Sequence, residues 1–183
     1  MGVDSSVDDF LDYLMEEEEG GYVDVPGDSG GCTKYGIVRR TLSRWRRKEV
    51  SCEDVKALTK GEARHIYTQW YYRDPKFDQI PATPRKLRNL LVDAAVQHGT
   101  GKADANQSCP ATHWLQEAVG AHSDGIIGPH TLTAVQSADL EAAYRGVLSR
   151  RLEYYGGILS NHPDQAKFAR GWMRRMRPFV EAV

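Results

Sequence analysis

The first apolar residues of the chain recur at the spacing of an amphipathic helix. Positions i, i+3, i+4 and i+7, counted from residue 7, are apolar, and such positions share one face of a helix. These residues are Val7, Phe10, Leu11 and Leu14. The pattern predicts a helix over 6–19, because Gly20-Gly21 follows and glycine commonly ends a helix.

Several later segments carry helix signals of their own. Thr59 followed by Glu62 is a capping box and predicts a helix that runs to about Tyr72. Pro84 and Pro129 each favour a helix start, since proline suits the first helical turn. Further apolar stripes at helical spacing lie within 87–95, 140–155 and 168–179.

Strand patterning is confined to a short hairpin across 22–37. We therefore expect a mainly α fold, in which the helix over 140–155 halts at Gly156-Gly157 or soon after. A chain of 183 residues is long enough for a well-packed core. We expect a catalytic lobe over 1–83 and a helical lobe over 84–183, packed as one globular unit.

The first candidate for chemistry is Glu19, at the point where the chain leaves the first predicted helix. The acidic run 16–18 is interpreted as a solvated face. For Glu19, the negative end of the helix dipole and the neighbouring carboxylates destabilise the ionised form. A carboxyl group kept protonated in this way can donate a proton to the leaving oxygen of a glycosidic bond.

Asp28 and Thr33 follow within the same glycine-rich stretch. In glycoside hydrolysis a second carboxylate stabilises the positively charged sugar centre or activates water. Asp28 offers that group, but an aspartate before serine and glycine also often caps a turn. Both roles therefore stay open for Asp28 at this point.

The residues around these positions form a long motif. Glu-Gly-Gly-Tyr at 19–22, followed by Asp-x-Gly-Gly-x-Thr-x-Tyr-Gly-Ile at 28–37, resembles the signature of the phage endolysins and prophage muramidases of glycoside hydrolase family 108. The similarity continues through 58–81 and 92–99, where Gln97 and His98 depart from the family pattern. The order of glutamate, aspartate and threonine also resembles the constellation of phage-type lysozymes.

The resemblance implies a peptidoglycan muramidase with a lysozyme-like helical fold, in which a glycine-rich loop or short hairpin lines the cleft. It implies that Glu19 is the proton donor, that Asp28 stabilises positive charge or assists water, and that Thr33 positions water or a sugar hydroxyl. The implied substrate-binding residues are Tyr22, Tyr35, Gly20 and Gly21. Trp70, Trp114 and Trp172 are instead expected to pack in the core.

A second motif lies in the C-terminal half. Leu115-Gln116, followed by Asp-Gly-x-x-Gly-Pro-x-Thr at 124–131, resembles the pattern of small helical peptidoglycan-binding modules. The alternative is that Asp124-Gly125 and Gly128-Pro129 only mark turns. Both interpretations are compatible with each other.

Cysteine and histidine placement favours no cofactor and no metal. The three cysteines show no C-x-x-C spacing and are expected to be free thiols, and Cys32 is not expected to be a nucleophile. The six histidines show no paired-ligand spacing that would place two nitrogens on one helix face.

Charge and hydropathy bear on partners and location. No apolar run approaches the roughly 18 to 20 residues needed to cross a bilayer, and the N-terminus shows no secretory signal. We expect synthesis in a bacterial host cytoplasm and action on the cell wall or in the periplasm. Basic stretches within 39–48 and 170–177 are solvated faces or contacts to anionic envelope polymers, rather than nucleic-acid sites.

The prediction is thus a monomeric N-acetylmuramidase whose partner is bacterial peptidoglycan. A lytic transglycosylase would use the same glutamate but release an anhydro sugar. A non-catalytic wall-binding protein would keep the 124–131 motif without needing Glu19. Whether anomeric configuration is retained or inverted depends on a carboxyl separation that sequence does not give.

Overall fold

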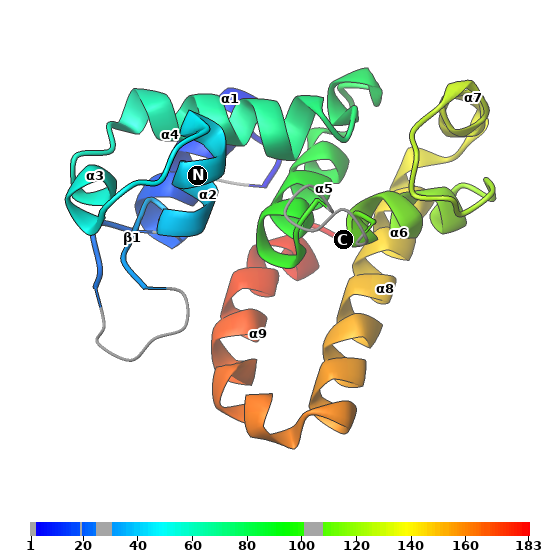
Figure 1. Cartoon of the computed structure of the whole chain (residues 1–183). Helices are drawn as coiled ribbons and strands as arrows, with labels where there is room; N and C mark the ends of the chain where they lie inside the picture. Colours follow the sequence, from blue (N-terminus) through cyan, green and yellow to red (C-terminus); the bar gives the residue numbers. More distant parts are fainter. Residues whose placement is uncertain (1–2, 19, 25–30, 101–107) are drawn as a thin grey trace.

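The structure is a computed structural model, and it describes residues 3–18, 20–24, 31–100 and 108–183. A central helix, α5 (Arg85–His98), contacts α1, α6 and α8 (Figure 1). The N-terminal elements are α1 (Val7–Tyr13), η1 (Leu14–Glu18), β1 (Thr33–Lys34), β2 (Ile37–Val38), α2 (Arg39–Arg46), α3 (Cys52–Lys56), α4 (Lys60–Ile66), η2 (Tyr67–Arg73) and η3 (Phe77–Gln79). The C-terminal elements are α6 (Pro110–Ala118), α7 (Pro129–Ser137), α8 (Leu140–Asn161), η4 (Pro163–Gln165) and α9 (Ala166–Glu181).

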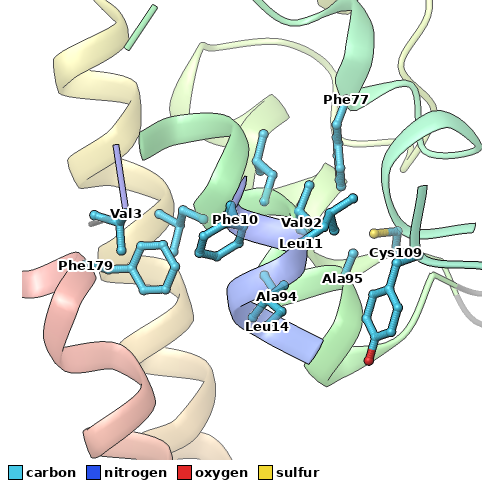
Figure 2. Close-up of a cluster of buried hydrophobic side chains, with 14 of the residues drawn as sticks. Val3, Phe10, Leu11, Leu14, Phe77, Val92, Ala94, Ala95, Cys109 and Phe179 are labelled. Atoms are coloured by element: carbon cyan, nitrogen blue, oxygen red, sulfur yellow. The ribbon is translucent and has the colours of Figure 1, made fainter. Parts of the chain in front are cut away.

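The first helix forms where the apolar stripe predicts it. Ser6 caps α1 by accepting a hydrogen bond from the Asp9 backbone N–H, and the helix continues as a π-helical turn, η1, to Glu18. Phe10 lies edge-on to Phe179 of α9, with ring centroids 6.0 Å apart, and Leu11 lies near Val92 of α5 in Figure 2. This buried stripe attaches the segment before Glu19 to the core of the molecule.

The helix after Thr59 is also found, with one difference at its start. Thr59 accepts a hydrogen bond from the backbone N–H of Glu62 at 3.1 Å. The Glu62 carboxylate does not return to the cap, however; it accepts two hydrogen bonds from Arg46 of α2, at 2.9 and 2.7 Å. The predicted capping box is therefore half formed, because an ion pair between α2 and α4 competes for the glutamate.

The C-terminal helices α8 and α9 run antiparallel and are joined through η4 (Figure 1). The helix expected to halt at Gly156-Gly157 or soon after ends at Asn161, and Pro163 opens the next element. A helix tolerates glycine at a modest energetic cost. Trp172 stacks on Tyr155 across this helical hairpin, with ring centroids 5.2 Å apart. Each of Trp70, Trp114 and Trp172 packs in or against the core, as expected.

A charged cluster ties α5 to α8 and α9. Asp93 is buried and accepts hydrogen bonds from Arg151 and Arg175, the latter at 2.9 Å. Although burial alone would raise it, the two guanidiniums hold the pKa of Asp93 below its usual value. Gln97 accepts hydrogen bonds from Arg151 at 2.7 Å and from the Tyr155 hydroxyl at 2.6 Å. The departure from the family pattern at Gln97 is thus accommodated by contacts that join α5 to α8.

The expectation of three free thiols is wrong. Cys32 and Cys52 form a disulfide, with Cα atoms 5.7 Å apart, and only Cys109 of the three is free. Cysteine number and spacing gave no sign of this pair, because the contact arises from β1 packing beside α3. No helix among the described residues is long and apolar enough to cross a membrane.

Candidate functional site

Residues 33–38 of the glycine-rich motif fold into a β-hairpin with a two-residue turn. β1 and β2 pair antiparallel, with Thr33 opposite Val38 and Lys34 opposite Ile37. Tyr35 and Gly36 form the turn, with φ of 51° and 71°. Positive φ at both central positions is the requirement of the tight turns that match strand twist. The predicted hairpin is therefore present, and in the described part of the chain its two paired strands cover 33–34 and 37–38.

A third chain segment lies against this hairpin. Val23 and Thr33 exchange two backbone hydrogen bonds of 2.8 Å, and the Tyr35 N–H donates to the Gly20 carbonyl at 3.1 Å. Gly20 has a φ of 67°, a conformation that favours glycine. The backbone on the C-terminal side of Glu19 is thereby fixed to the hairpin.

Three contacts from two neighbouring elements, α3 and η2, hold the hairpin. The Cys32–Cys52 disulfide links the residue before β1 to the first residue of α3. Lys34 Nζ donates to the Lys56 carbonyl at 2.7 Å. The buried Tyr67 of η2 donates its hydroxyl to the Tyr35 carbonyl at 2.9 Å. Such cross-links are what a catalytic loop needs to keep its groups in a fixed geometry.

The predicted site residues differ in what the structure says of them. Glu19 and Asp28 lie outside the described residues. Thr33 uses its backbone in the ladder with Val23, and its hydroxyl makes no hydrogen bond to another described residue. A Cβ atom added at Gly21 would meet no other described residue within 4 Å beyond its chain neighbours.

The two predicted substrate tyrosines are half-buried near the hairpin. Tyr22 donates to Asp24 Oδ2 at 3.2 Å, and Lys56 Nζ lies 5.9 Å from its ring centroid. Lost contact with solvent, then the Asp24 carboxylate, raises the pKa of Tyr22. Lys34 Nζ lies 5.4 Å from the Tyr35 ring centroid. Both phenols thus present partly exposed rings with a cation nearby, an arrangement that can contact sugars.

Glu16, near the acidic end of the first helix, takes part in a surface ion pair. Glu16 forms an ion pair with Lys60 of α4. Lys60 also lies 3.5 Å from Asp12, which accepts a hydrogen bond from Arg64 at 2.8 Å. The Glu16 side chain is 55% exposed, so this surface ion pair is compatible with the interpretation of Glu16 as part of a solvated face.

The second motif is organised around a buried glutamine. Gln116 donates to Asp124 Oδ1 at 2.7 Å and to Thr131 Oγ1 at 3.1 Å, and its own oxygen accepts from the Gly125 N–H at 2.8 Å. The hydrogen bond from Gln116 lowers the pKa of Asp124. Pro129 occupies the first turn of α7, as predicted. The Asp-Gly and Gly-Pro elements thus serve as turns that Gln116 ties together.

Sequence motifs did not point to Tyr67 or Lys34 as residues that hold the hairpin. Tyr67 and Lys34 carry no signal of their own, since a lone tyrosine or lysine in a helix or hairpin is common. Their role depends on which elements pack around the hairpin.

Comparison with known proteins gives the context of this site. The family model described as "Glycosyl hydrolase 108" matches residues 12–99, and that described as "Predicted Peptidoglycan domain" matches residues 110–177. Among solved structures, that of Brucella abortus SagA is 32% identical over 97% of this chain and 95% of that chain, with a TM-score of 0.75. No curated protein sequence gave a significant match. The chain has a mainly helical, lysozyme-like fold, acts as a peptidoglycan hydrolase and belongs to the glycosyl hydrolase 108 family.

Proposed function

We propose that the chain is an N-acetylmuramidase that cleaves the β-1,4 bond between N-acetylmuramic acid and N-acetylglucosamine, with Glu19 as general acid. The observation that carries this proposal is the fixed backbone next to Glu19. η1 ends at Glu18, and the Gly20 carbonyl is bonded to the turn residue Tyr35. A general acid needs a fixed position relative to the leaving oxygen.

In the proposed reaction, the Glu19 carboxyl donates its proton to the glycosidic oxygen as the bond to the anomeric carbon breaks. The positive charge that develops on the sugar is stabilised by Asp28, or Asp28 assists the attacking water. Thr33 orients water or a sugar hydroxyl through its Oγ1. Tyr22 and Tyr35 hold the sugar rings, and Gly20 and Gly21 allow the glycan to approach the backbone.

We further propose that residues 1–83 form the catalytic lobe and residues 84–183 the helical lobe of a monomer that acts at the bacterial cell wall. The match of residues 110–177 to a peptidoglycan domain supports a glycan-facing role for the second lobe. Within that lobe, Gln116 donates hydrogen bonds to Asp124 and Thr131. We therefore assign the 124–131 motif a mainly structural role.

The test compares Glu19→Gln with Glu16→Gln, a matched change three residues earlier whose side chain pairs with Lys60. Solubilisation of dye-labelled peptidoglycan should fall by at least about a hundredfold for Glu19→Gln, since general acid catalysis is commonly worth that much. Glu16→Gln should keep most of the activity. Equal activity of wild type and Glu19→Gln would refute the assignment.

A further inference from the structure

The solvent-facing side of α9 carries a row of basic side chains. Their spacings of three and four residues place them on one helix face over about 15 Å of the helix axis. These residues are Lys167, Arg170, Arg174 and Arg177, and all four are exposed. Together with Gly171 and Met173 they line a groove of about 660 Å³, which we call the α9 basic groove.

The opposite side of α9 fixes this row of cations in the fold. Met176 and Phe179 are buried, and Trp172 stacks on Tyr155 of α8. Because this face of the helix packs against the core, the basic face points outward. The ends of α8 and α9 that η4 joins project away from the other helices, so a broad surface can reach them (Figure 1).

Most of the positive charge in the groove is not neutralised within the described part of the chain. Glu181 pairs with Arg177 at 2.7 Å, but no described carboxylate forms an ion pair with Lys167, Arg170 or Arg174. The whole chain has a net charge of −1, so this row concentrates positive charge on one face of a protein that is not basic. The charge of this face therefore favours an anionic partner.

Apolar side chains on the same helical hairpin narrow the kind of partner. Met173 and Val180, which are 43% and 47% exposed, each follow an arginine of the row by three residues, so they border the groove. Of the eight large apolar residues exposed in the described chain, six lie on α8, on α9 or just after it: Leu152, Tyr154, Phe168, Met173, Val180 and Val183. A hydrated polyanion has no apolar layer to receive such side chains. A bilayer surface takes cations at its headgroups and apolar side chains just beneath them.

We propose that the α9 basic groove docks the protein on the surface of a bilayer that contains anionic phospholipids. Arg170 and Arg174 contact lipid phosphates, because the guanidinium fork suits phosphate oxygens. Met173 and Val180 enter the headgroup layer beside them. The contact is peripheral and does not involve Glu19, and it holds a peptidoglycan hydrolase close to the wall that lies against the membrane.

The test measures cosedimentation of the full-length protein with vesicles. Wild-type protein should bind vesicles of equal parts phosphatidylglycerol and phosphatidylcholine but not vesicles of phosphatidylcholine alone, and high salt should release it, because salt screens exposed charges. Arg170→Gln combined with Arg174→Gln should weaken binding roughly thirtyfold, at about fivefold per charge. Lys48→Gln combined with Arg73→Gln removes two exposed charges outside α9 and should leave binding unchanged.

A second pair of variants separates a bilayer from other polyanions. Met173→Ser should weaken vesicle binding by roughly fivefold, as expected for an apolar side chain that is about half exposed. Ile126→Ser is the matched control, since that residue is 64% exposed but lies outside the hairpin. Duplex DNA serves as the competing polyanion, and wild-type protein should bind it more weakly than the anionic vesicles.

Equal binding to the neutral and anionic vesicles, or binding to neither, would overturn the proposal. So would wild-type affinity for anionic vesicles in Met173→Ser or in the double arginine variant. Tighter binding to DNA than to vesicles would assign the groove to a soluble polyanion instead. If the double arginine variant loses its helical circular dichroism, Lys167→Gln combined with Arg170→Gln replaces it. The assay requires no turnover, so failure of the proposed muramidase reaction is a separate result.

Discussion

The hydroxyl of Tyr67 donates a hydrogen bond of 2.9 Å to the carbonyl of Tyr35. This contact joins Tyr67, the buried first residue of the π-helical segment η2, to the turn of the only hairpin in the described part of the chain. The Tyr35 N–H also donates to the Gly20 carbonyl, so Tyr35 links Tyr67 in the core to the backbone beside Glu19.

Tyr67→Phe should therefore impair catalysis more than folding. Loss of one hydrogen bond lowers the free energy of unfolding by about 1 kcal/mol, while looser positioning of the turn should reduce kcat/KM on peptidoglycan by roughly three- to tenfold. Tyr72→Phe is the matched control, since its hydroxyl contacts Arg88 at 3.2 Å instead of the hairpin. An unchanged kcat/KM for Tyr67→Phe would contradict this role.

The disulfide should be detectable by counting thiols. Denatured protein without reductant should expose one reactive thiol, from Cys109, and three after reduction. Replacing both Cys32 and Cys52 with alanine should lower the free energy of unfolding by about 3 kcal/mol, since the bridge closes a loop of 20 residues. Three thiols before reduction would show that the bridge does not form.

His98 should make stability depend on pH between neutral and acid. It lies among the rings of Trp114, Tyr154 and Tyr155, and burial, followed by the charge of Arg151, lowers its pKa from 6.5 to about 3. The unfolded chain takes up a proton below pH 6.5 that the folded chain refuses, so stability is lost as pH falls from 6.5 toward 3.

The free energy of unfolding should drop by about 2 kcal/mol between about pH 7 and about pH 5 on account of this group. In urea denaturation, the free energy of unfolding of His98→Phe should therefore fall by about 2 kcal/mol less than that of the wild type over the same pH range. His122→Gln, with a largely exposed side chain, should keep the wild-type slope. An unchanged slope for His98→Phe would mean that His98 is protonated in the folded protein.

Gln116 should matter for folding before it matters for wall binding. Gln116→Leu removes hydrogen bonds to Asp124, Thr131 and Gly125, and the free energy of unfolding should fall by about 2–4 kcal/mol. Gln136→Leu, at an exposed position of α7, should change it little. Full stability of Gln116→Leu together with lost peptidoglycan affinity would instead place this motif at the glycan.

The positions of helices were predicted well where a single local sequence signal determines where the helix forms. The stripe from Val7 to Leu14 and the proline at 129 each led to a helix close to the expected place. The end of α8 lies four residues beyond Gly157 because glycine only weakens a helix. The capping box at Thr59 is incomplete because the Glu62 carboxylate pairs with Arg46.

The contacts around the site were harder to predict, since they join segments far apart in the chain. Cys32 meets Cys52, Lys34 meets Lys56, and Tyr67 meets Tyr35 only after the helices have packed. A local motif shows which chemical groups lie together in sequence. It does not show which neighbours hold them.

Hydrolysis of the muramic acid linkage with Glu19 as general acid leaves a reducing end on the released sugar. Mass spectrometry of the soluble fragments from isolated peptidoglycan, with and without borohydride reduction, detects that end. Wild-type protein should release fragments that end in reducible muramic acid, and Glu19→Gln should release none. Anhydro-muramic products would make the enzyme a lytic transglycosylase, and the same fragments from Glu19→Gln would contradict the role of Glu19.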